Sequence, residues 1–143
     1  MNELLGRFQA EFGLTSERLL EVVCEAILLC EKTAKERLEK AFMKSPPRTL
    51  ESELDWHREV SRRVLAEQLR RVYTERYSDH SARALKRHAF SLAQEVLGNR
   101  LPPSLRNKHV KLLSIHDVAL LFRVLGVKSR LAEALEEEAS YGE

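Results

Sequence analysis

Histidine and acidic side chains are the residues of this chain that could act in acid–base catalysis or hold a metal ion. Helical di-metal sites place a glutamate three residues before a histidine, which puts both side chains on one face. The residues three positions before the five histidines are Leu54, Tyr77, Leu85, Arg106 and Leu113, and none of them is acidic. The sequence therefore lacks the di-metal pattern.

A carboxylate and an imidazole stand four residues apart at Glu53 and His57. This spacing is more typical of an exposed charge pair than of a pair of metal ligands. The sequence also lacks a His-Glu-x-x-His segment, a Cys-x-x-Cys segment, a glycine-rich phosphate loop and a Gly-x-Ser-x-Gly turn. We therefore predict no enzymatic activity, no bound metal and no cofactor.

The cysteines and the apolar segments bear on where the protein resides. Cys24 and Cys30 stand six residues apart, on different sides of a helix, so they cannot form a disulfide with each other there. No stretch approaches the roughly 18 apolar residues of a membrane span, and no leader with a basic start and an apolar run is visible. We predict an intracellular protein, cytoplasmic or nuclear, with reduced cysteines.

Charge is distributed unevenly along the chain although its formal net charge is only +2. Residues 1–30 hold two basic and five acidic side chains, and residues 31–55 hold six of each. Residues 56–111 hold thirteen basic and five acidic side chains, whereas residues 112–143 hold three and six. A basic middle is thus flanked by a neutral stretch and by acidic ends.

The two halves of this basic middle differ. Glu59 can pair with Arg62 or Arg63, and Glu67 stands four residues from both Arg63 and Arg71. This spacing predicts an exposed ladder of ion pairs. Residues 80–111 instead hold seven basic side chains and a single acid, Glu95. Such a basic face is either a solvated surface or a binding face for an acidic protein partner or for the phosphates of a nucleic acid. Arg83, Lys86 and Arg87 stand three and four positions apart, so we expect them on the helix face opposite Leu85, Ala89 and Leu92. We assign partner binding to Arg83, Lys86, Arg87, Arg106, Lys108 and Lys111.

These observations favour a non-enzymatic protein–protein interaction module, a helical adaptor or scaffold. Its partner would present an acidic or an amphipathic helical surface, bound on the basic face or in an apolar groove between helices. Self-association is a further option, with the acidic cluster Glu133–Glu138 of a second copy as the partner surface. The alternative is a nucleic-acid-binding helical protein that uses the basic region 80–111.

Apolar residues recur every three or four positions almost throughout, which predicts an all-α fold. We expect one domain over residues 1–143, a compact bundle of five to six helices around a central apolar helix at about 16–43. Proline breaks are expected near 45–48 and 101–104, and a frayed end at 140–143. The remaining helices are expected at 2–12, 49–77, 80–97, 115–125 and 130–139, with a short one near 105.

Local signals mark several helix ends. Thr15 or Ser16 and Ser129 are expected N-caps, Ser114 and Asp117 resemble a capping box, and Gly13 and Gly126 are expected C-terminal stops. The predicted core residues, taken from the apolar periodicity, are Val23, Ile27, Val64, Leu69, Leu92, Val118 and Phe122.

Overall fold

The computed structural model describes residues 2–31, 36, 40, 49–106 and 112–141. Over these residues the chain is helical and contains no strand, as the periodicity predicts. The helices are α1 (Glu3–Phe12), α2 (Ser16–Leu29), α4 (Leu50–Tyr77), α5 (Ser81–Leu97), α6 (Pro103–Arg106), α7 (Ile115–Leu125) and α8 (Arg130–Tyr141). Two short 3₁₀ turns, η1 (Ser78–His80) and η2 (Gly98–Arg100), follow α4 and α5.

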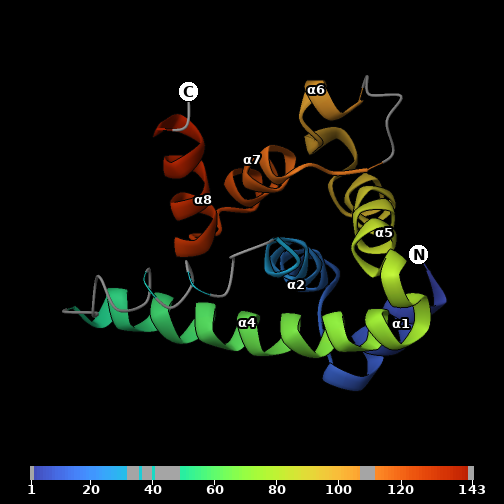
Figure 1. Ribbon diagram of the computed structural model, residues 1–143. Coiled ribbons are helices and arrows are strands. Elements are labelled where there is room, and N and C mark those ends of the chain that lie inside the picture. The colour runs from blue at the N-terminus through green and yellow to red at the C-terminus, as the bar shows by residue number, and fades with distance from the viewer. Residues whose placement is uncertain (1, 32–35, 37–39, 41–48, 107–111, 142–143) are drawn as a thin grey trace.

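Helix α2 is the central element of the bundle. It packs against α4, α5 and α7, and Figure 1 shows it end-on with these three helices around it. Every residue from Leu19 to Leu29 is buried, including the predicted core residues Val23 and Ile27. A helix that is covered on all sides must be apolar on nearly all sides, which explains why apolar residues dominate the sequence of α2.

The predicted length of this central helix is wrong. Helix α2 ends at Leu29, and Cys30 closes it by donating its backbone N–H to the carbonyl of Ile27. The buried stretch ends together with the helix, and the next two residues, Cys30 and Glu31, are only partly buried. The rest of the expected helix lies outside the described residues, apart from Glu36 and Lys40, which are helical.

The local signals at helix ends are confirmed. The Thr15 side chain accepts the Arg18 N–H at the start of α2, and Ser114 and Asp117 form a reciprocal capping box at the start of α7. Gly126 ends α7 with a φ of 70°, a left-handed conformation in which a side chain would be strained. Capping depends on residues within one helical turn, so the sequence is sufficient to identify it.

The buried face of α4 differs from the predicted apolar stripe. Val64 is 49% exposed, although it was expected in the core with Leu69, which is fully buried. The α4 side chains that are buried lie three and four positions apart: Glu59, Arg62, Ala66, Leu69 and Tyr73. Two of these five are charged, so a rule that looks for apolar residues selects the wrong face.

A sharp turn joins α4 to α5. Ser78 adopts a φ of 51°, which is unusual for a residue other than glycine and costs on the order of 1 kcal/mol. The turn brings α5 back against α4 and α2. The end of α4 and the start of α5 therefore form a corner at the right of Figure 1, next to α1.

The C-terminal helices complete the fold. Leu92 on α5 and Val118 and Phe122 on α7 are buried, as predicted. Helix α8 continues through Tyr141, slightly past its expected end. None of the described helices is long and apolar enough to cross a membrane.

Candidate functional site

One side of α5 packs into the bundle and the other forms part of its surface. Leu85, Ala89 and Leu92 are buried on the inner side. Arg83 and Arg87, one helical turn apart, are exposed on the outer side. The predicted separation of a basic face from an apolar face on this helix is therefore correct for these two arginines.

Arg83 and Arg87 line a pocket of about 350 Å³ at the corner between α4 and α5. The residues that line this basic pocket are Tyr77, His80, Arg83, Ala84, Arg87 and His88. None of them is acidic. Within the described residues, no ion pair joins Arg83 or Arg87 to a carboxylate. Two guanidinium groups thus border one cavity without an internal counter-charge.

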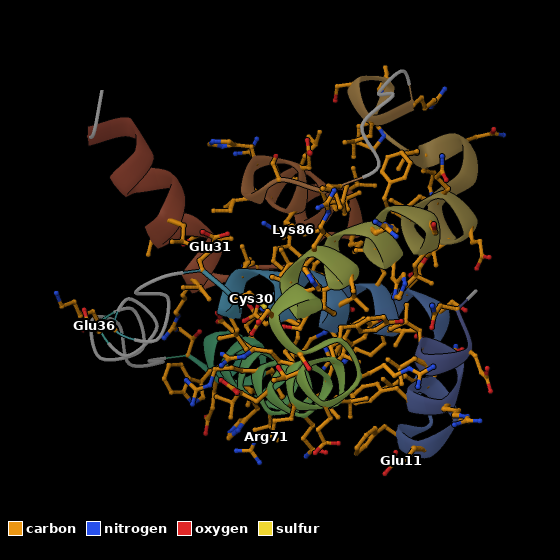
Figure 2. The ribbon with its side chains drawn as sticks, turned by 45° about the vertical axis from the view of Figure 1, so that its right-hand side comes forward. Glu11, Cys30, Glu31, Glu36, Arg71 and Lys86 are labelled. Atoms are coloured by element: carbon orange, nitrogen blue, oxygen red, sulfur yellow. The ribbon has the colours of Figure 1, made fainter. Side chains whose placement is uncertain are left out.

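Lys86, which was predicted to share this face, points elsewhere. Its Nζ lies 3.9 Å from Oε1 of Glu31, just beyond the end of α2. Figure 2 shows Lys86 on the side of α5 that faces Cys30 and Glu31, away from Arg71 on the outer edge of α4. The charge of Lys86 is thus partly neutralised within the molecule.

The other basic residues between 80 and 111 also lie apart from the basic pocket. Arg106 donates from Nε to the Leu101 carbonyl at 2.7 Å and from Nη2 to the Asn99 carbonyl, so it holds the loop around Pro102. Arg100 pairs with Glu17 of α2 at 2.7 Å. Lys108 and Lys111, both predicted to bind the partner, lie outside the described residues.

Aromatic rings fix the wall of the basic pocket. The ring of Tyr77 stacks on that of Tyr73, with centroids 5.4 Å apart, and meets the edge of the His88 ring. His88 Nδ1 lies 2.6 Å from the hydroxyl of buried Tyr73, and its Nε2 lies 3.2 Å from the side-chain nitrogen of Asn2. The wall is therefore held from both α4 and the start of α1.

The hydrogen bonds define which nitrogen of His88 carries the proton. The Asn2 side-chain oxygen caps α1 by accepting the Leu4 N–H, so its NH₂ group must face His88 and donate to Nε2. Neutral His88 then carries its proton on Nδ1 and donates it to Tyr73. A second proton on Nε2 would oppose the Asn2 donor. Burial lowers the pKa of His88, and the charge of Arg87 lowers it further.

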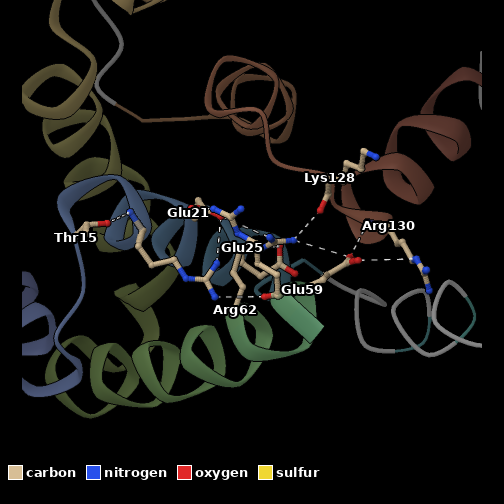
Figure 3. A network of polar contacts seen from close by, with 9 residues as sticks. Thr15, Glu21, Glu25, Glu59, Arg62, Lys128 and Arg130 are labelled. Atoms are coloured by element: carbon tan, nitrogen blue, oxygen red, sulfur yellow. Dashed lines mark hydrogen bonds and ion pairs between the residues drawn. The ribbon is translucent and has the colours of Figure 1, made fainter. Parts of the chain in front are cut away.

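A second charged cluster was missed by the sequence analysis. Glu59 and Arg62 are 4% and 1% exposed, so the predicted exposed ladder is wrong at these positions. They meet Glu21 and Glu25 of α2 in the interior (Figure 3). We refer to Glu21, Glu25, Glu59, Arg62 and Arg130 as the buried charge network.

Arg62 is the centre of this network. Its guanidinium lies 3.7–4.0 Å from the carboxylates of Glu21, Glu25 and Glu59. These distances are too long for hydrogen bonds, so Arg62 stabilises the carboxylates mainly by its charge. Its Nη2 donates to the Lys128 carbonyl at 3.1 Å, which ties α4 to the turn between α7 and α8.

Glu25 is the least supported carboxylate of the buried charge network. It is fully buried, and neither of its oxygens has a hydrogen-bond partner among the described residues. Burial raises the pKa of Glu25 to about 7, against the opposing effect of Arg62 and with a contribution from Glu59. Glu21 differs, because Arg18 donates to it at 3.2 Å.

Glu59 connects α4 to α8. Its Oε1 accepts the backbone N–H of Arg130 at 2.7 Å, at the positive end of the α8 dipole. The Arg130 guanidinium lies 4.6 Å from the centre of the Trp56 ring. These contacts tie the start of α8 to α4.

The cavity next to the buried charge network is small, at about 50 Å³. Its lining residues are Asp55, Arg58, Arg62, Gly126, Val127 and Lys128. Such a volume holds water rather than a substrate. The network is accordingly a structural feature, and the basic pocket is the candidate binding site.

Metal-ligand groupings are absent from the described part of the chain: no three His, Cys, Asp or Glu side chains lie close enough to hold an ion. Glu53 and His57 form the expected exposed pair, 3.8 Å apart. Cys24 and Cys30 are free thiols. Burial raises the pKa of both thiols, which makes them poor nucleophiles.

Comparisons with models of protein families, with curated protein sequences and with solved structures found no match to this chain. The argument for function accordingly depends on the basic pocket and its surroundings.

Proposed function

We propose that this chain is a non-enzymatic protein-interaction module that binds an acidic segment of a partner protein at the basic pocket. The observation that carries the proposal is the pair Arg83 and Arg87, which border one cavity without a carboxylate among its lining residues. Folding does not require this excess of charge, because the inner face of α5 is buried through apolar residues. Binding of an acidic group would offset the repulsion between the two guanidinium groups.

The test is a charge reversal at the two pocket arginines, Arg83→Glu with Arg87→Glu. Lys86 is left unchanged because its pairing with Glu31 would confuse binding with stability. Binding of a fluorescent glutamate-rich peptide is measured by anisotropy. We expect affinity to fall by roughly tenfold or more, mainly through a slower association rate. Unchanged affinity in a folded variant would assign this face to solvent.

The same assay separates the alternative partners. Nucleic acid is tested with a random-sequence single strand over a range of salt concentrations, since log K falls by about 0.7 per contacted phosphate for each unit of log salt. Tighter binding of the strand than of the peptide, lost in the charge-reversal variant, would favour the nucleic-acid function. Dimers in sedimentation that the reversal dissociates would identify a second copy as the partner.

A further inference from the structure

The charge of the basic pocket exceeds what one carboxylate can neutralise. Two other exposed arginines of the described structure each pair with one carboxylate, Arg7 with Glu3 and Arg100 with Glu17, both at 2.7 Å. Arg83 and Arg87 stand one turn apart on the same cavity with no such partner within the described residues. A phosphorylated side chain carries about −1.5 to −2 charges at pH 7, against −1 for Asp or Glu.

The arrangement of the two guanidinium groups also suits a phosphate. Side chains at i and i+4 on a helix lie about 5–6 Å apart at Cβ, so the ends of two arginines can converge on one tetrahedral anion. Each guanidinium presents a planar pair of donors that matches two phosphate oxygens, which an ammonium group cannot do. The same helix face thus supplies both the charge and the directed donors.

The size and rigidity of the basic pocket also favour a phosphate group over a carboxylate. Its volume of about 350 Å³ exceeds the needs of a carboxylate and accommodates a phosphate with the stem that carries it. Tyr77 and His88 are held by ring contacts and by the hydrogen bonds of His88 to Tyr73 and Asn2. A wall that is already ordered loses little conformational entropy when a ligand binds.

Resting on the proposed function, we propose that the acidic group that enters the basic pocket is a phosphorylated side chain of the partner protein. Its phosphate lies between Arg83 and Arg87, and its stem packs against Tyr77 and Ala84. His88, which also lines the basic pocket, stays neutral because its Nε2 accepts from Asn2 and its Nδ1 donates to Tyr73.

The experiment compares one fluorescent peptide in four forms, with phosphotyrosine, phosphoserine, glutamate or alanine at its central position. We expect at least one phosphorylated form to bind roughly tenfold or more tightly than the glutamate form, a difference of about 1.4 kcal/mol. Arg83→Gln with Arg87→Gln should abolish this preference. The matched control, Arg7→Gln with Arg71→Gln, removes two exposed charges outside the pocket and should retain it.

Two further readouts test the placement of the phosphate. Arg83→Lys with Arg87→Lys keeps the charge but removes the paired donors, so we expect most of the preference for phosphate to be lost. In proton NMR, the ring signals of His88 should shift as the phosphopeptide binds, because the anion offsets the nearby charge of Arg87. Absence of any shift at saturation would contradict the placement.

Each failure has a distinct meaning. Equal affinity for the glutamate and phosphorylated forms overturns the phosphate inference and leaves the acidic-partner function in place. Absence of binding to all charged forms overturns both. Phenyl phosphate that binds as tightly as the phosphopeptide overturns the assignment to a protein segment, since a free phosphate monoester would then be sufficient.

Discussion

Two arginine clusters in this molecule share their chemistry and differ in their surroundings. In the buried charge network, Arg62 is 1% exposed and lies within 4.0 Å of three carboxylates from two helices. In the basic pocket, Arg83 and Arg87 are exposed and border a cavity without acids in its lining. The charge of the first cluster is neutralised inside the protein, whereas the charge of the second is available to a partner.

The comparison shows that the role of a guanidinium depends on which helices cover it. Burial of Arg62 requires counter-charges, because an isolated charge in the interior is very costly. Helix α2 supplies them at Glu21 and Glu25, four residues apart and thus on one face. No helix covers the outer face of α5 among the described residues, so its arginines remain hydrated.

The largest expected effect is loss of stability on removing the charge of Arg62. Arg62→Met leaves Glu21, Glu25 and Glu59 buried around an apolar side chain, so we expect a loss of about 3–5 kcal/mol in urea melts. The control on the same helix is Arg71→Met, which is exposed and should change stability by less than about 0.5 kcal/mol. Similar losses in both variants would contradict the division into buried and exposed arginines.

The next effect concerns the pH dependence of stability. The pKa of Glu25 in the folded protein is about 7, above its ordinary value of 4.5 in the unfolded chain, so the folded state binds more protons between these values. The contribution of Glu25 to the free energy of unfolding is therefore present below about pH 4.5 and is lost as the pH rises towards 7. The change is on the order of 3 kcal/mol.

The measurement for Glu25 is the pH profile of urea stability in the wild type and in Glu25→Gln. The groups that face Glu25 are Arg62, Glu59 and Arg63, all on α4. Arg62 opposes the rise in the pKa of Glu25. We expect the difference between the two profiles to follow the Glu25 titration, because glutamine keeps the shape and cannot ionise. Parallel profiles would show that another group is responsible.

A smaller effect of opposite sign is expected from His88. Its pKa is lowered on folding, so the unfolded chain takes up a proton first, and the contribution of His88 declines as the pH falls below about 6.5. The groups that face the His88 ring are Arg87 on the same helix, Asn2 at the N-cap of α1, and Tyr73 and Tyr77 of α4. In His88→Gln the free energy of unfolding should therefore fall less steeply below about pH 6.5 than in the wild type. The same decline in both proteins would contradict the assignment to His88.

The smallest effect sharpens the contrast between the clusters. Arg83→Gln with Arg87→Gln should alter the free energy of unfolding by less than about 0.5 kcal/mol, since neither side chain pairs with a described residue. Binding and stability would thus respond to different arginines. A loss of several kcal/mol would show that the basic pocket is part of the folding core.

The sequence by itself determined the features that depend on neighbours along the chain. Helix ends are set within one turn by Thr15, by the pair Ser114 and Asp117, and by Gly126. The all-helical class follows from the spacing of apolar residues, and the excess of base over acid between 80 and 111 can be counted directly. These properties are local, so no knowledge of packing is needed to find them.

The tertiary structure alone decided which charges are buried and which are free. The clue to the network was present in Glu21 and Glu25, two acids inside the most apolar stretch, but their partner Arg62 lies about 40 positions away. Glu31 likewise removes Lys86 from the predicted face. The energy of a charge depends on the three-dimensional distance to its counter-charge and on its exposure to water, and neither is a property of the chain order.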